Sequence, residues 1–113
     1  MKTTKLNKII KEIFINHDMS YNHASISAGA LINAELVGAH GHGLSRLKMY
    51  CDRIKKKVIN PKPKFRIKKI SKSITHIDAN NSIGFVAADL GIKQAIINAK
   101  KTGFGLVGIE NSG

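Results

Sequence analysis

The amino-acid sequence predicts an α+β fold in which three helices precede a strand–strand–helix–strand segment. Two observations support this. Apolar residues recur every three or four positions as far as residue 57, and they alternate in short runs after Pro61 and Pro63. Two prolines one residue apart cannot continue a helix and favour an extended linker. We therefore expect a helical N-terminal subdomain over residues 1–60 and a second, α/β region over residues 64–113.

The first two helices are predicted from their apolar spacing. Five apolar side chains of the first helix stand at positions i, i+3, i+4, i+7 and i+8, namely Leu6, Ile9, Ile10, Ile13 and Phe14. This helix should end near residues 16–18. The second should follow Ser20, bury a face of mostly small side chains, and end at Gly38, since glycine is favoured just after a helix. The expected buried residues of the second helix are Ala24, Ala28, Leu31, Ile32 and Leu36.

A glycine- and histidine-rich loop that leads into the third helix is the candidate site. With a helix over residues 44–57, His42, Arg46 and Tyr50 recur every four residues and share one face. An arginine binds a carboxylate through two parallel hydrogen bonds, a histidine titrates near neutral pH, and a tyrosine adds a hydroxyl on an apolar body. The trio therefore suits a small organic acid with a carbonyl or hydroxyl group. The alternative is that Arg46 is an ordinary surface arginine and Tyr50 a core residue with an exposed hydroxyl. A neighbouring apolar stripe should anchor the helix in a core: Leu47, Cys51, Ile54 and Val58.

Two short strands should follow the prolines. Residues 65–68 and 74–77 alternate apolar and polar side chains around a turn at residues 71–73. His76, on the second strand, is expected to be structural. Residues 78–82 are polar and predict a loop.

The last two predicted elements are a helix and a buried strand. The helix is predicted from the periodic residues Phe85, Ala88, Ile92, Ala95, Ile96 and Ala99. It should end at Gly103, and residues 104–109 should form the strand. Residues 103–108 also match the dinucleotide fingerprint G-x-G-x-x-G, but that fingerprint requires glycines that leave a strand and open a helix. Here the predicted order is reversed, so we reject the match.

Charge and cysteine content limit the classes of protein that fit. The net charge is +12, from 19 basic and 7 acidic residues. This favours nucleic-acid binding, but the lysines are scattered and no aromatic residues interleave with them to stack bases. A general richness in lysine explains the charge equally well.

The single Cys51 makes no intrachain disulfide and fits a reducing compartment, so we expect a cytoplasmic protein. No apolar run is long enough to span a membrane. His40 and His42 lack a third ligand of suitable type, so no metal site is predicted.

The order of these motifs resembles the N-terminal portion of the malate/L-lactate dehydrogenase family of the non-Rossmann type. That family includes ureidoglycolate, sulfolactate and 2,3-diketogulonate oxidoreductases. The resemblance covers nearly the whole chain. It rests on residues 38–47 with Tyr50, then on residues 59–61, 77–78, 83–84, 99–103 and 105–112.

The resemblance implies both a fold and an activity. The helical region should lead into the beginning of a nicotinamide-binding region with its own non-Rossmann topology. Members are homo-oligomers, usually dimers, and use NAD or NADP to transfer hydride to or from a small 2-oxo or 2-hydroxy acid. By that resemblance His42 is a catalytic residue, and His42, Arg46 and Tyr50 bind the substrate. No cofactor-binding residue, particular substrate or choice between NAD and NADP is assigned.

Two departures from the family pattern bear on activity. Gly41 stands where the family usually has a serine. The family's acid/base histidine would follow Gly113, and general acid catalysis needs a group within hydrogen-bond reach of the reacting oxygen. We therefore expect this polypeptide to be a truncated form that is inactive alone. The alternative function is a small basic interaction module without chemistry that binds RNA.

Overall fold

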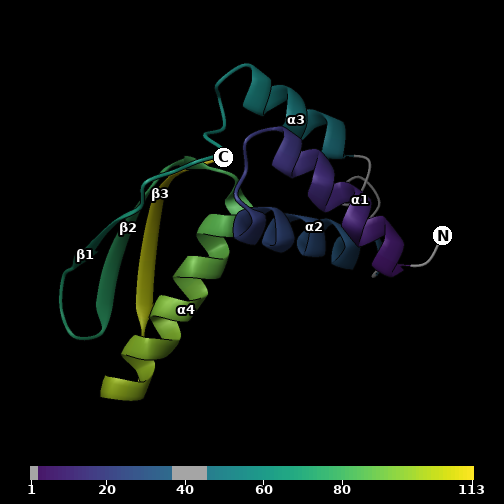
Figure 1. The fold of residues 1–113 in the computed structure, drawn as a ribbon. Helices are drawn as coiled ribbons and strands as arrows, with labels where there is room; N and C mark the ends of the chain where they lie inside the picture. Colours follow the sequence, from purple (N-terminus) through teal and green to yellow (C-terminus); the bar gives the residue numbers. More distant parts are fainter. Residues whose placement is uncertain (1–2, 37–45) are drawn as a thin grey trace. The chain divides into compact units, whose positions relative to one another are not determined.

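The computed structural model describes residues 3–36 and 46–113, which form four helices and three strands (Figure 1). The order is helix–helix–helix–strand–strand–helix–strand, so the predicted α+β class is confirmed. The chain divides into two compact units, residues 1–62 and residues 63–113. None of the described helices is long and apolar enough to cross a bilayer.

In the first unit, α1 (Thr3–Asn16) packs against α2 (Tyr21–Leu36). Ile10 and Phe14 of α1 are fully buried, as the apolar spacing predicts, and the helix ends at the predicted place. The buried face of α2 consists of Ala24, Ser27, Ala28, Leu31 and Ile32. Leu36 was expected on that face but is 67% exposed, because it lies at the last residue of the helix. Gly38 lies outside the described residues.

The third helix, α3, spans Leu47–Lys55 and is shorter than predicted. It ends early because the backbone N–H of Val58 bonds to the carbonyl of Arg53, and Lys57 takes a positive φ of 62°. This turn carries Val58 away from the apolar stripe, so the prediction of a buried Val58 is wrong. Cys51 and Ile54 are buried as expected, and Ile59 takes the core position.

The second unit is a three-stranded sheet in the order β1–β2–β3 with one long helix, α4 (Gly84–Thr102). β1 (Arg66–Lys69) pairs antiparallel with β2 (Ile74–Ser82), and β3 (Leu106–Ser112) pairs parallel with β2. The predicted turn between β1 and β2 is therefore confirmed. α4 connects the parallel strands and contacts both of them.

The predicted loop at residues 78–82 is wrong, because β2 continues through it to Ser82. The strand is irregular there, since Asn80 and Asn81 have φ values of 52° and 61° and the pairing with β3 shifts between Asp78 and Ser82. Asparagine tolerates this left-handed conformation better than most residues. The polar residues that suggested a loop therefore form a bulged strand end.

α4 ends at Gly103, which is in the left-handed conformation at φ 94°, as predicted. The apolar residues whose spacing predicted this helix do not all form its buried face, because Ala88, Ile92 and Ile96 are exposed. The buried residues are Val86, Ala87, Gly91 and Asn98. Gly91 explains the difference, because it faces the side chains of Val107 and Ile109 on β3 and leaves them room.

β3 was expected over residues 104–109 as a buried strand, and it is displaced and mostly exposed instead. It begins two residues later because Gly103 and the following residues complete the turn from α4. Phe104 and Leu106 are each 59% exposed. The apolar residues that predicted a buried strand are therefore mostly exposed in this chain.

Candidate functional site

Arg46 and Tyr50, two of the three predicted site residues, lie at the start of α3. Arg46 is the residue just before the helix, with φ −94° and ψ −7°, and Tyr50 follows one helical turn later. Both side chains are half-buried. Residues four apart share a helix face, so the two can act on one ligand. His42 lies outside the described residues, and its predicted place beside them stays a prediction.

Arg46 is a poor residue for stabilising this helix end. Its side chain makes no capping hydrogen bond to the first turn, whereas Ser, Thr, Asp or Asn would. A cation at a helix N-terminus also meets the positive end of the helix dipole. The favourable charges lie elsewhere, because Arg53 and Lys55 occupy the last turn and Lys48 pairs with Asp52 at 2.9 Å. A capping role therefore does not explain an arginine at position 46.

A surface hollow of about 430 Å³ also lies on α3, but on another face of the helix. It is lined by Lys48, Met49, Asp52, Arg53 and Lys56, and this set includes neither Arg46 nor Tyr50. Lys48 and Asp52 pair across it. We interpret it as the solvated face of the helix.

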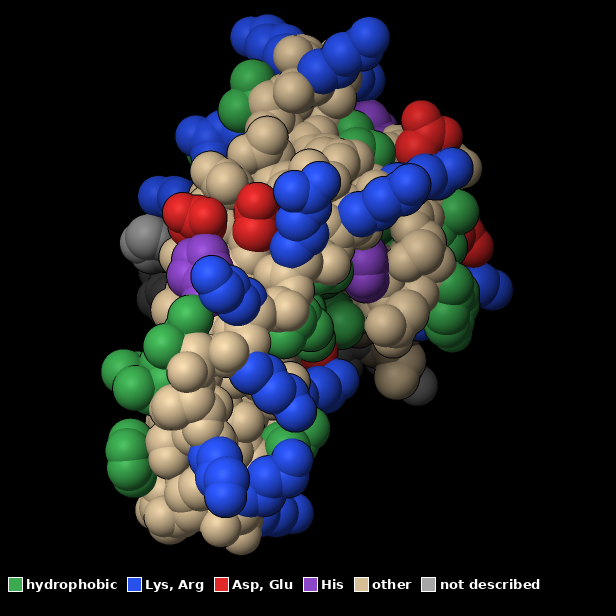
Figure 2. Space-filling model, turned by 90° about the vertical axis from the view of Figure 1, so that its left-hand side faces the viewer, with side chains coloured by type: hydrophobic (Ala, Val, Ile, Leu, Met, Phe, Trp, Pro, Cys, Tyr) green, Lys and Arg blue, Asp and Glu red, His purple; other side chains and the backbone are tan. Residues whose placement is uncertain are grey.

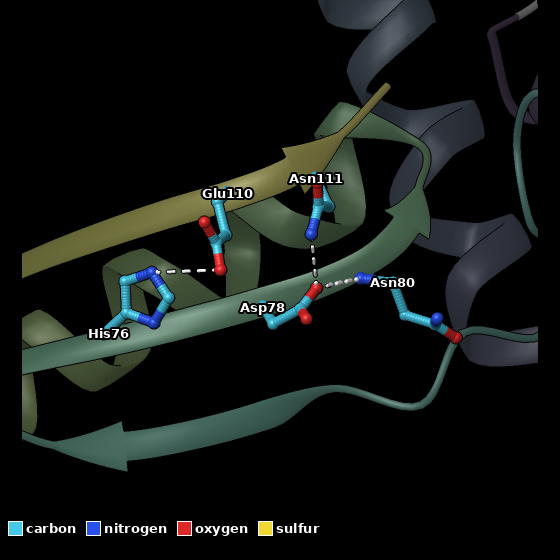
Figure 3. Close-up of polar contacts among 5 residues, drawn as sticks. All are labelled: His76, Asp78, Asn80, Glu110 and Asn111. Carbon is cyan, nitrogen blue, oxygen red and sulfur yellow. Dashed lines mark hydrogen bonds and ion pairs between the residues drawn. The ribbon is translucent and has the colours of Figure 1, made fainter.

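The second unit contains a polar cluster on neighbouring strands β2 and β3, which sequence reasoning missed (Figure 3). The Oδ1 atom of Asp78 accepts a hydrogen bond from the backbone N–H of Asn80 at 3.0 Å. The same atom accepts one from the side-chain amide of Asn111 at 3.1 Å. His76 Nε2 lies 3.6 Å from Glu110 Oε1 on the same pair of strands. Asp78 therefore links the middle of β2 to the carboxyl end of β3.

These hydrogen bonds keep Asp78 ionised. The backbone N–H of Asn80 lowers the pKa of Asp78 most, followed by the Asn111 amide, and the charge of Arg66 acts in the same direction. Asn111 itself has a positive φ of 58°. Residues held in sparsely populated backbone conformations often gather at functional sites. The sequence offered one signal for this cluster: Asp78 is followed closely by Asn80 and Asn81, and the Asn111-Ser112 pair comes 33 residues after Asp78.

The glycines of the rejected dinucleotide fingerprint all have structural roles. Gly103 ends α4, Gly105 lies against the backbone of Ala95, and Gly108 lies in β3 beside His76. A helix precedes these glycines and a strand contains the last of them, so the rejection is confirmed. The described residues thus present no phosphate-binding cradle of this type, and we assign no cofactor contact to them.

Among residues 3–36 and 46–113, no group of three or more histidine, cysteine, aspartate or glutamate side chains is placed to hold a metal ion. Cys51 is buried, and this burial raises the pKa of its thiol. We therefore interpret the Cys51 thiol as part of the packed core.

The comparisons with known proteins agree with this geometry. The family model for malate/L-lactate dehydrogenase matches residues 1–113. Ureidoglycolate dehydrogenase (NAD(+)) from Escherichia coli K12 is 32% identical over 108 residues, which are 96% of this chain and 31% of that protein. Malate/(S)-sulfolactate dehydrogenase from Methanothermus fervidus is 38% identical over 94 residues, covering 83% of this chain and 28% of that protein.

Two solved structures share the fold. Malate dehydrogenase from Pyrococcus horikoshii OT3 superimposes with a TM-score of 0.95 at 33% identity, over 99% of this chain and 32% of that one. Sulfolactate dehydrogenase from Methanocaldococcus jannaschii also gives 0.95, at 30% identity, over 99% of this chain and 33% of that one.

The helical unit and the strand–strand–helix–strand unit thus define a dehydrogenase fold that does not use the Rossmann fingerprint. The chain belongs to the malate/L-lactate dehydrogenase family. It spans about a third of the length of the curated relatives it matches, and it corresponds to their first third.

Proposed function

We propose that this chain supplies part of the substrate site of an NAD(P)-dependent 2-hydroxyacid dehydrogenase. In this proposal the Arg46 guanidinium binds the substrate carboxylate, and His42 and Tyr50 lie beside it. The observation that carries the proposal is the position of Arg46, half-buried at the N-terminus of α3 and one helical turn before the half-buried Tyr50. A guanidinium matches a carboxylate through two parallel hydrogen bonds. The first backbone N–H groups of α3 add favourable charge for an anion.

The nicotinamide cofactor is proposed because relatives of this chain are named as using one. One relative is named as NAD(+)-dependent and another, (2R)-3-sulfolactate dehydrogenase from Chromohalobacter salexigens, as NADP(+)-dependent. A nicotinamide group would supply the hydride acceptor or donor. We assign none of the described residues to hold it. Homo-oligomer formation and a cytoplasmic location complete the proposal, supported by the family resemblance and by the unpaired thiol of Cys51.

Within the second unit, Asp78 is proposed as a positioning residue. It holds Asn111 in a left-handed conformation near the end of β3, through the 3.1 Å hydrogen bond. The backbone continues from there to Gly113, whose N–H donates to the carbonyl of Ser82 at 2.7 Å. The ends of β2 and β3 are thereby held together at the carboxyl ends of these parallel strands, where open α/β folds usually bind ligands.

Binding of a small hydroxy acid tests the carboxylate assignment. L-malate is titrated into the ¹⁵N-labelled chain, and the amide resonances of residues 46–50 are followed by NMR. We expect saturable shifts and little response to lactamide, which lacks the carboxylate. Arg46→Lys keeps the charge but loses the two-pronged geometry, so it should weaken binding about tenfold or more. Tyr50→Phe removes one hydroxyl and should weaken binding by about two- to tenfold.

The matched control is Arg53→Lys, the same substitution on the exposed last turn of the same helix. It should change the affinity by less than about twofold, as expected for a surface charge. Equal effects of the two arginine variants, or equal responses to L-malate and lactamide, would refute the assignment. A salt-dependent mobility shift with RNA, together with no response to L-malate, would support the basic interaction module instead.

A further inference from the structure

The second unit carries a basic hollow at the opposite end of the sheet from Asn111. Its volume is about 270 Å³, and it is lined by Lys69, Ser71, Lys72, Asn98 and Lys101. These residues come from β1, from the turn between β1 and β2, and from the last turns of α4. We call this set the lysine hollow. In Figure 2, Lys and Arg side chains gather at the lower end of the view, where α4 terminates in Figure 1.

Buried hydrogen bonds hold the two walls of the lysine hollow together. The Asn98 side chain of α4 is only 3% exposed, and its Nδ2 donates to Thr75 Oγ1 at 2.9 Å and to the Ser73 carbonyl at 3.4 Å. The hydroxyls of Ser73 and Thr102 also bond to one another. The turn and the helix therefore have a fixed spacing before any ligand arrives, which lowers the entropy lost on binding.

The strand register directs Lys69 into the lysine hollow. Lys69 pairs with Thr75 across the antiparallel strands, so the two side chains lie on the same face of the sheet. Thr75 on that face bonds to Asn98 of α4. Lys69 thus extends toward the helix side, where Lys101 also lies.

No carboxylate of this unit balances these charges. Residues 64–77 and 90–109 contain no aspartate or glutamate. The unit's three carboxylates each contact another group: Asp78 bonds to Asn111, Asp89 pairs with Lys93 at 2.9 Å, and Glu110 lies beside His76. Three lysines that line one hollow without a counter-charge repel one another, and a bound anion would relieve this repulsion.

We propose that the lysine hollow binds a small phosphate-bearing ligand of about the size of a pyrophosphate group. Lysine ammonium groups bind phosphate oxygens as point charges and do not require one fixed geometry. Ser71 adds a donor: its Oγ already accepts from the backbone N–H groups of Ser73 and Ile74, so its own hydrogen can point at the ligand.

Size and lining residues distinguish this site from the proposed substrate site, because the hollow is lined by residues of the second unit only, whereas Arg46 and Tyr50 belong to the first. The hollow is smaller than most pockets for drug-sized molecules, which favours a compact anion over a dinucleotide or a nucleic-acid strand. It lies at the amino ends of β2 and β3, roughly 20 Å along the strands from Asn111 at about 3.3 Å per residue. It is thus a second site, and its existence does not depend on the proposed function.

NMR titration of the full chain with inorganic pyrophosphate tests the proposal. We expect saturable shifts in the amides of residues 69–73 and 98–102, which weaken as the salt concentration rises. Lys72→Gln and Lys101→Gln should each weaken binding about tenfold, the usual size of a lost charge-assisted contact. The matched control is Lys100→Gln, which removes the same charge from the adjacent residue of α4 that does not line the hollow. It should change the affinity by less than about twofold.

Three results would overturn the proposal. One is an absence of saturable shifts with pyrophosphate. Another is equal weakening by Lys100→Gln and Lys101→Gln, which would show that only general surface charge is sensed. The third is tighter binding of single-stranded RNA than of pyrophosphate with affinity that rises with strand length, because this would identify an extended nucleic-acid surface.

Discussion

Gly105 is the position where the structure predicts the largest effect of adding a single methyl group. A Cβ built at Gly105 would lie 2.1 Å from the carbonyl oxygen of Ala95 and 2.9 Å from its carbonyl carbon. Ordinary contacts begin at 3.4 Å, so the gap between this residue and α4 must open by more than an ångström. Both sides are backbone, so no flexible side chain can move aside. Overpacking of this kind costs about 1–3 kcal/mol and occasionally more.

Gly105→Ala should therefore destabilise the second unit, because it forces the start of β3 away from α4. In thermal unfolding followed by circular dichroism, each kcal/mol corresponds to about 4–8 °C in a small domain. Amide hydrogen exchange of residues 106–112 then shows whether the loss lies in β3. The matched control is Gly108→Ala within β3, where the added Cβ would lie 3.8 Å from His76 Cδ2, an ordinary contact.

The result that refutes this reasoning is equal stability of the two variants. It would mean that β3 and α4 separate without cost, and that the close approach at Gly105 does not hold the unit together. Equal loss of NADH binding by both variants would contradict the structural roles assigned to these glycines, since a cofactor cradle would need both.

Three further predictions concern other parts of the chain. Gly29→Ala in α2 should raise the free energy of unfolding by about 1 kcal/mol in urea titrations, because its added Cβ meets nothing within 4 Å and alanine favours helix. The pKa of Asp78 is lower in the folded chain than the value of about 3.9 expected for an unfolded chain. Ionised Asp78 therefore stabilises the fold above that unfolded pKa, and this stabilisation is lost as the pH falls through the pKa of the folded chain. Asn111→Ala should raise the pKa of Asp78 in a ¹³C carboxyl titration, and an unchanged pKa would contradict the hydrogen bond. Asn98→Ala should destabilise the second unit by about 1–3 kcal/mol, since it leaves the buried Thr75 hydroxyl without its donor, and the double variant with Thr75→Val should recover part of this loss in a double-mutant cycle.

The spacing of residues along the sequence predicts those elements whose buried residues are close together in the sequence. The five apolar residues of α1 give the right helix, and Ile10 and Phe14 among them are buried because they lie on the stripe that an amphipathic helix buries, whereas Ile9 is exposed. The same reasoning identifies the turn between β1 and β2 and the glycine that ends α4. Arg46 and Tyr50 on one helix face follow from their four-residue spacing alone.

The face of α4 that packs on the sheet could not be predicted in the same way. Hydrophobicity favours Ile92 and Ile96, which are exposed, over Gly91, which is buried. The helix approaches β3 where the small residue leaves room for Val107 and Ile109. The face of α4 that contacts the sheet is therefore set by close packing and not by apolar content. Close packing depends on the shape of β3, which the sequence of the helix does not contain.

By itself the amino-acid sequence determined the α+β class, the order of the elements, the family and the arginine–tyrosine pair of the candidate substrate site. The class, the element order and the pair depend on residue types and spacings within a helical turn or a hairpin, and the family follows from the resemblance carried by several motifs along the chain. Only the tertiary structure decided that β2 runs on through its asparagines, that Asp78 binds Asn111 across 33 residues, and that three lysines from separate elements surround one hollow. The physical reason is that strand register and helix packing bring these groups together, and both are set by the surfaces of distant segments fitting one another.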